Sequence, residues 1–102
     1  MDRLKHLQEL LIQTPNDPFI IYGIALEYRN IDGEKTKYYF DLLLSEHPSY
    51  LPTYYQAGEL YEDLDEDRAK EIYLKGMQLA KEQENMHAYG ELKSVYDLLD
   101  MV

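Results

Sequence analysis

The sequence contains no cysteine, so disulfide bonds and thiolate metal sites are excluded and cysteine usage indicates no redox compartment. It also has no long apolar run, since no stretch approaches the ~20 apolar residues of a membrane-spanning helix. The first residues, from Met1 to His6, are charged and polar where a secretion signal has an unbroken apolar stretch. These absences favour a soluble, cytoplasmic protein that has no membrane partner.

Basic residues are scarce: 10 lysines and arginines face 20 aspartates and glutamates, for a formal charge of −10. A surface of this sign repels phosphate backbones and anionic lipids, which argues against nucleic acid as a partner. Two explanations of the acidic excess remain open. It steers a basic partner, or, more plainly, it keeps a small domain soluble.

Motifs for catalysis and metal binding are also lacking. The histidines His6, His47 and His87 lie on separate predicted elements, and no serine is flanked by the glycines of a nucleophile turn. The acidic run at 63–67 lacks the central glycine and the closing glutamate of a calcium loop, so we expect a solvated turn in which Asp65 or a nearby acid caps a helix. We therefore predict no enzyme activity, no cofactor and no metal site.

The chain repeats itself at an offset of 33 residues, within a length of 102 residues that fits one domain. Residues of the same type coincide at many positions under this offset, which argues against chance. The sets that it aligns are Leu7 with Phe40 and Tyr73, Leu11 with Leu44 and Met77, Pro15 with Pro48, Tyr22 with Tyr55, Tyr28 with Tyr61, and Asp32 with Asp65.

Each repeat unit predicts a pair of helices, because its apolar and small residues recur at spacings of three and four. The first helices carry Ile21, Ile24, Ala25 and Tyr28, and then Tyr54, Ala57, Gly58 and Tyr61. The second helices carry Thr36, Phe40, Leu43 and Leu44, and then Ala69, Tyr73, Gly76 and Met77. Turns at 30–33 and 63–65 join the two helices of a pair, and Pro15 and Pro48 separate successive units.

These patterns predict an all-α fold of about six antiparallel helices in a single domain over 1–102. We expect a lone helix over 2–14 that corresponds to the second helix of a repeat (a second-type helix). A first repeat over 16–48, a second over 49–84 and a capping helix over 85–100 would follow it. In the capping helix, an offset of 34 places Ala88, Leu92 and Val95 on the core positions of the second unit. A terminal helix of atypical pattern is what a stack of repeats needs to cover its last core face.

The order of residue types in each unit resembles the tetratricopeptide repeat family: a large residue, a small pair, an aromatic, then small, aromatic and small positions and a closing proline. The residues that carry the resemblance are Ile21, Ile24, Ala25, Tyr28, Thr36, Phe40, Leu43 and Pro48, and then Tyr54, Ala57, Gly58, Tyr61, Ala69, Tyr73 and Gly76. Two positions depart from the family pattern, Leu43 where a small residue is usual and Lys81 in place of the closing proline. The resemblance implies a right-handed solenoid of helical hairpins.

The small residues of this pattern have a physical reason to be there, because helices approach closely where side chains are short. Ala25, Gly58, Ala69 and Gly76 are the expected close-approach positions. The aromatic residues Tyr28, Phe40, Tyr61 and Tyr73 are expected to fill the spaces between the helices as packing residues.

The resemblance also implies a concave groove, lined by the first helices of successive units, that binds a protein or peptide. The side chains expected to face this groove are those one position after the apolar core residues of each helix. They are Phe19, Tyr22, Leu26, Arg29, Tyr55, Glu59 and Glu62, and in the last helix Met86, Tyr89, Lys93 and Tyr96. For Tyr22 and Tyr55 the sequence leaves both binding and packing open. Related domains that hold a peptide carboxylate use cationic side chains where this chain has Tyr22, Leu26 and Gln56, so an apolar or basic partner is favoured over an acidic one.

The sequence thus predicts a non-catalytic protein-interaction module or adaptor, as a monomer or weak homodimer. The alternative is a structural subunit that associates with itself through its terminal helices. An apolar run near the end of the chain motivates that alternative: Tyr96, Leu98, Leu99, Met101 and Val102.

Overall fold

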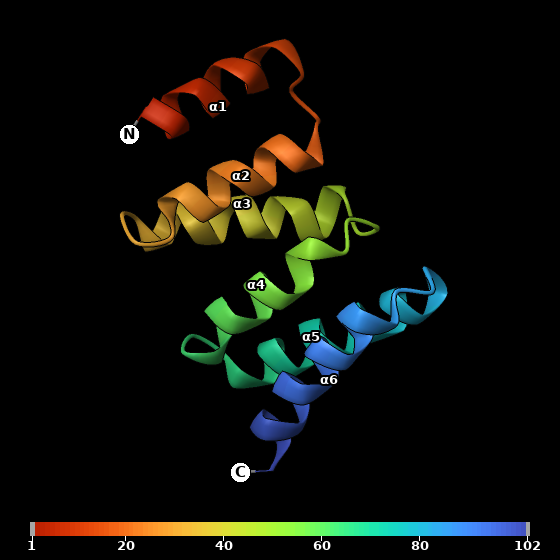
Figure 1. The fold of residues 1–102 in the computed structure, drawn as a ribbon. Coiled ribbons are helices and arrows are strands. Elements are labelled where there is room, and N and C mark those ends of the chain that lie inside the picture. The colour runs from red at the N-terminus through yellow and green to blue at the C-terminus, as the bar shows by residue number, and fades with distance from the viewer. Residues whose placement is uncertain (1, 102) are drawn as a thin grey trace. The chain divides into compact units, whose positions relative to one another are not determined.

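The computed structural model describes residues 2–101, which form six α-helices joined by short loops (Figure 1). The helices are α1 (Asp2–Gln13), α2 (Pro18–Tyr28), α3 (Gly33–Glu46), α4 (Pro52–Glu62), α5 (Glu66–Glu82) and α6 (Met86–Asp100). Over this described range there is no β-strand. The prediction of an all-α helical-repeat fold is confirmed.

Side-chain caps define where four of the helices begin. The carboxylates of Asp17, Asp32 and Asp65 accept hydrogen bonds from the backbone amides at the starts of α2, α3 and α5, and the amide oxygen of Asn85 does the same for α6. These bonds satisfy amides that the first turn of a helix leaves without intrahelical partners. The expected cap at Asp65 is confirmed.

The end of α5 has a distinct backbone geometry. Glu84 has a φ of 57°, in the left-handed region, and the amide of Asn85 donates to the carbonyl of Ala80 at 2.8 Å. A left-handed residue just after a helix lets the chain satisfy the last carbonyls and turn away. The chain can therefore reverse within a few residues and begin α6.

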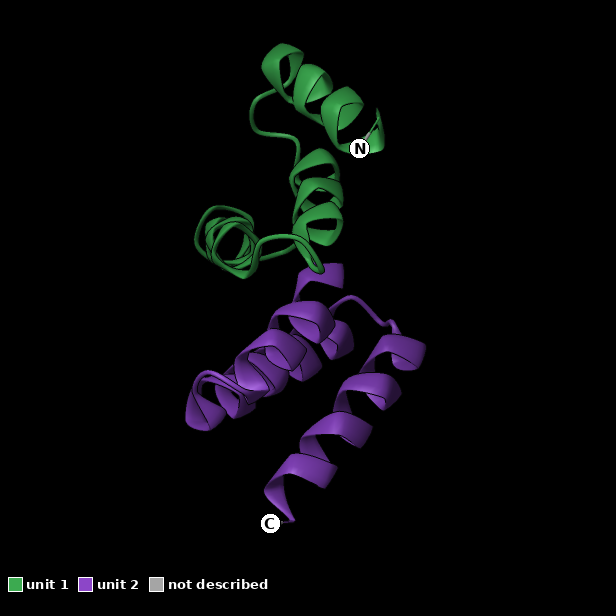
Figure 2. Ribbon diagram, turned by 90° about the vertical axis from the view of Figure 1, so that its left-hand side faces the viewer, with its two compact units in different colours: residues 1–50 green, residues 51–102 purple. Residues whose placement is uncertain are grey.

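The chain consists of two compact units (Figure 2). Unit 1 is Met1–Tyr50 and contains α1, α2 and α3; unit 2 is Leu51–Val102 and contains α4, α5 and α6. Each unit therefore has three helices and a core of its own.

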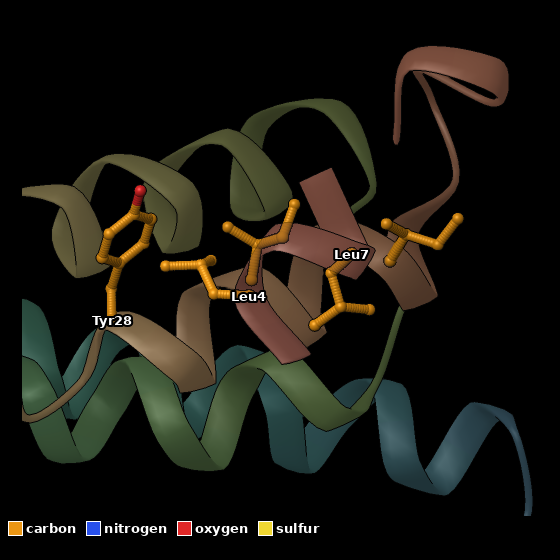
Figure 3. Close-up of a cluster of buried hydrophobic side chains, with 5 residues drawn as sticks. Leu4, Leu7 and Tyr28 are labelled. Atoms are coloured by element: carbon orange, nitrogen blue, oxygen red, sulfur yellow. The ribbon is translucent and has the colours of Figure 1, made fainter. Parts of the chain in front are cut away.

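In unit 1, α2 is the middle helix and packs against both α1 and α3. Toward α1 it contributes Ile20, Ile24 and Tyr28, which form a buried cluster with Leu4 and Leu7; Figure 3 shows the two leucines alongside Tyr28. A second set on α2 and α3 is also buried, consisting of Ile21, Ala25, Thr36, Phe40 and Leu43. Burial on two sides explains why the sequence of α2 is apolar almost all round.

In unit 2, α5 is the middle helix, between α4 and α6. A Cβ added to Gly58 would lie 2.6 Å from Cδ1 of Tyr73, and one added to Gly76 would lie 2.6 Å from Cβ of Tyr54 and 3.1 Å from Cδ1 of Leu92. Such distances are shorter than van der Waals contact, so the two glycines let α4, α5 and α6 approach closely. The predicted close-approach role of Gly58 and Gly76 agrees with this geometry.

Candidate protein-binding site

The predicted binding residues of unit 1 lie along α2. Asp17 and Pro18 begin the helix, which places Phe19 in its first turn with 68% of its surface exposed. Leu26 and Arg29, near the other end, are half-buried. Phe19 is thus the most accessible large apolar side chain among the predicted residues of this unit.

Tyr22 has packing partners inside unit 1. Its ring centroid lies 5.7 Å from that of Tyr50, in an edge-to-face arrangement, and 6.4 Å from that of Phe40. Burial raises the pKa of Tyr50, and the nearby carboxylate of Asp17 raises it further. The contacts with these two rings leave Tyr22 half-buried. Its ring in turn helps to hold the loop that carries Tyr50 against the hairpin.

The predicted residues of unit 2 lie on α4, and they differ in accessibility. Glu59 is exposed and Tyr55 is half-buried. Glu62 is half-buried, and its Oε2 accepts a hydrogen bond from the hydroxyl of Tyr73 at 2.5 Å. The carboxylate of Glu62 therefore orients a buried core tyrosine, a structural function that the sequence analysis did not anticipate.

The last predicted residue, Tyr89, lies in the first turn of α6, which Asn85 caps. It is half-buried, and Nζ of Lys81 lies 5.1 Å from its ring centroid. This cation–π contact connects the last turn of α5 to the first turn of α6. Leu92, which follows Tyr89 by three residues, is the buried residue of α6.

Sequence reasoning missed an aromatic cluster on unit 1. Tyr28 and Tyr39 stack with their centroids 6.0 Å apart, and Tyr38 meets Tyr39 edge-on at 5.1 Å. Burial raises the pKa of Tyr39, with further increases from Tyr28 and Tyr38 and an opposing effect of Lys35. The sequence signal for the cluster was the adjacent pair Tyr38-Tyr39 in the second helix of the first repeat, whereas the family resemblance points to the first helices as the binding surface.

Two negative findings concern the described part of the chain. Within residues 2–101 no group of three or more histidine, aspartate or glutamate side chains is placed to hold a metal ion. Nor is any helix in this range sufficiently long and apolar to cross a lipid bilayer.

The repeated hairpins, the small residues at helix contacts and the buried aromatics define a helical-repeat protein. Two solved structures of a tetratricopeptide repeat domain protein from Salinibacter ruber are similar to it. The solution NMR structure has a TM-score of 0.80 and 31% sequence identity, and the match covers 86% of this chain and 91% of that one. The crystal structure has a TM-score of 0.79 and 30% identity, with 85% of this chain and 99% of that one covered.

No protein-family model matches the sequence, and no match is found among curated proteins. The likeness to the Salinibacter ruber domain nevertheless spans nearly all of that domain at 31% identity. The chain belongs to the tetratricopeptide repeat family.

Proposed function

We propose that the protein is a non-catalytic interaction module that binds a protein or peptide segment through the first helices of its repeats. The observation that carries the proposal is the repeat fold together with the accessible aromatic side chains on α2 and α4. Within unit 1, α2 carries the exposed ring of Phe19, and within unit 2, α4 carries the half-buried ring of Tyr55 beside exposed Glu59. Aromatic rings of this kind are common anchors in protein interfaces.

The proposed partner segment is apolar or basic rather than acidic. Twenty acidic residues outnumber ten basic ones in the chain, so a cationic segment is attracted at long range and an anionic one is repelled. Apolar contact with the rings would supply most of the affinity, while Glu59 would set the charge preference. The other proposed binding residues are Tyr22, Leu26 and Arg29 in unit 1 and Glu62 and Tyr89 in unit 2. Of these, Tyr22, Glu62 and Tyr89 also make contacts within their own units.

Capture of partners from native cell extract on immobilised protein tests this proposal. The variants are Phe19→Ala and Tyr55→Ala, one for each unit, with Leu74→Ala as a matched control because Leu74 is an exposed apolar side chain on α5. A protein that is retained by the parent and the control but lost from either variant supports the proposal. Retention that is equal on all four proteins would contradict the assignment of the binding residues.

Tyr22→Ala needs its own control, since the loss of its contacts with Tyr50 and Phe40 disturbs unit 1. Tyr22→Phe keeps the ring and those contacts. If Tyr22→Ala abolishes capture while circular dichroism shows a native helix content, the ring contacts the partner. If the helix content falls in parallel, the residue is structural and the binding surface excludes it.

A second candidate function is self-association through α6. The observation that favours it is the exposure of Leu98 and Met101, which are 67% and 80% accessible, beside half-buried Tyr96 and Leu99. Val102 of the predicted run lies outside the described residues. A mass in solution that rises with protein concentration, and that falls to the monomer value in Leu98→Glu, would support this candidate, and a constant monomer mass would reject it.

A further inference from the structure

A surface pocket of about 540 Å³ opens in unit 1, where the end of α2 meets the first turns of α3. Three tyrosines, two carboxylates and one lysine form most of its lining: Tyr28, Tyr38, Tyr39, Asp32, Glu34 and Lys35. These residues do not belong to the surface proposed above, and α3 is a second-type helix. The pocket is thus a separate feature of the same unit.

The aromatic wall of the pocket is held in place by contacts within the unit. Tyr28 and Tyr39 are nearly parallel, with 5° between their rings, and Nε2 of Gln8 donates to the hydroxyl of Tyr28 at 3.1 Å. Tyr38 stands at 85° to Tyr39 and is 62% exposed. The cluster therefore combines two fixed rings with one ring that solvent or a ligand can reach.

The charges around the pocket favour a cation. Glu34 is exposed at its rim, and Oδ1 of Asp32 is held there by the amide of Lys35 at 3.2 Å. Nζ of Lys35 lies 5.1 Å from the centroid of Tyr28, so one ring of the cluster already accepts a cation on its face. The two carboxylates of the lining outnumber the single ammonium group of Lys35, and the whole chain has a formal charge of −10, so the pocket disfavours an anion.

We propose that this pocket binds an arginine side chain of a protein partner. A guanidinium is planar and weakly hydrated, so it can stack on the accessible ring of Tyr38 while its N–H groups donate to the carboxylate of Glu34. A lysine ammonium lacks the flat face and the paired donors. The inference rests on the proposed function in requiring a protein partner, but it assigns that partner a second contact, separate from the residues of α2 and α4 proposed above.

NMR titration of the full chain with a capped Gly-Arg-Gly peptide tests the pocket without any natural partner. The ring resonances of Tyr38 and Tyr39 are expected to shift saturably, and a capped Gly-citrulline-Gly peptide of the same shape but no charge is expected to leave them in place. Tyr38→Ala should weaken binding about fivefold, the change that corresponds to about 1 kcal/mol of cation–π attraction. Tyr38→Phe should bind like the parent, because it keeps the ring.

Glu34→Gln supplies the electrostatic arm of the same experiment. It should weaken the arginine peptide, whereas Glu82→Gln, which removes an equal charge from an exposed position in unit 2, should not. Tyr38 and Glu34 are exposed, so these changes leave the core intact, and circular dichroism of each variant verifies that.

Three results would overturn the inference: no saturable shift with the arginine peptide, an equal shift with the citrulline peptide, or a shift of the same resonances by a capped Gly-Glu-Gly peptide. None of them bears on the capture experiment, which depends on Phe19 and Tyr55. Failure of the pocket and failure of the proposed function are therefore distinguishable.

Discussion

The two units of the chain are built from the same repeat but have different middle helices. In unit 1 the middle helix is α2, a first-type helix packed against α1 and α3. In unit 2 it is α5, a second-type helix packed against α4 and α6. The same periodic sequence thus has to bury a different helix on two sides in each unit.

The two middle helices meet this requirement by different means. α2 uses large aliphatic residues, with Ile20, Ile21 and Ile24 all at most 8% exposed. α5 uses small residues, Ala69, Gly76 and Ala80, and Tyr73 fills the space beside Gly58 of α4. The comparison teaches that unit 2 depends on the closeness of its helices, whereas unit 1 depends on the volume of its side chains.

Replacement of one helix glycine by alanine in each unit should give the largest difference in stability between the units. Gly58→Ala places a Cβ 2.6 Å from Cδ1 of Tyr73, so we expect a loss of about 2 kcal/mol, since overpacking costs ~1–3 kcal/mol and helix propensity returns part of it. Gly23→Ala in α2 brings its Cβ 3.3 Å from the tip of Leu7, and we expect a change of at most about 1 kcal/mol. Urea unfolding followed by circular dichroism measures both free energies of unfolding. Equal effects of the two substitutions would remove the distinction between the units.

Removal of one tyrosine hydroxyl in each unit should give the next largest difference. Tyr73→Phe loses a hydrogen bond to the carboxylate of Glu62, for an expected cost of about 1.5 kcal/mol, as is typical of bonds to a charged group. Tyr28→Phe loses a bond to the neutral amide of Gln8, for about 0.5–1 kcal/mol. Adding Glu62→Gln to each variant is the control: it should add little to Tyr73→Phe and should act independently of Tyr28→Phe. An additive result for Tyr73 and Glu62 would show that their bond contributes nothing to stability.

Loss of a helix cap should destabilise the two units by the same amount, so the smallest difference between the units is expected here. Asp32 and Asp65 are one repeat offset apart, and each accepts a hydrogen bond from the amide three residues later, at 3.2 and 3.1 Å. We expect Asp32→Ala and Asp65→Ala each to cost about 1 kcal/mol, while the asparagine variants retain most of the stability. Thermal unfolding of the four variants checks this. A difference between the two alanine variants larger than either loss would mean that the caps are not equivalent.

The repeat could be predicted from the sequence because its core residues recur at a fixed offset. Tyr28, Tyr61 and Tyr73, predicted as packing residues, are all buried. Gly58 and Gly76 lie at helix contacts, as their place in the pattern indicated. Information of this kind is local and periodic, which is what a single sequence displays.

Contacts that are not periodic could not be predicted. Ile20 is buried because α1 covers it, although it lies outside the stripe that the repeats share. Tyr22 was expected beside the core, and it is half-buried because Tyr50, from a loop with no helical period, packs against its edge. Glu62 bonds to Tyr73 across a hairpin, and the pocket beside Tyr38 forms from three helices. Each of these depends on how helices meet, which the spacing within one helix does not record.

The most direct test of the binding account is oxidative footprinting of the chain with and without the captured partner. Phe19 and Leu98 suit it, because they are 68% and 67% exposed in the unbound chain and lie on α2 and α6. The account predicts that the partner lowers the oxidation of Phe19 and Tyr55 and leaves that of Leu98 unchanged. Protection of Leu98 with undiminished oxidation of Phe19 and Tyr55 would contradict it and place the interface at the C-terminal end of α6.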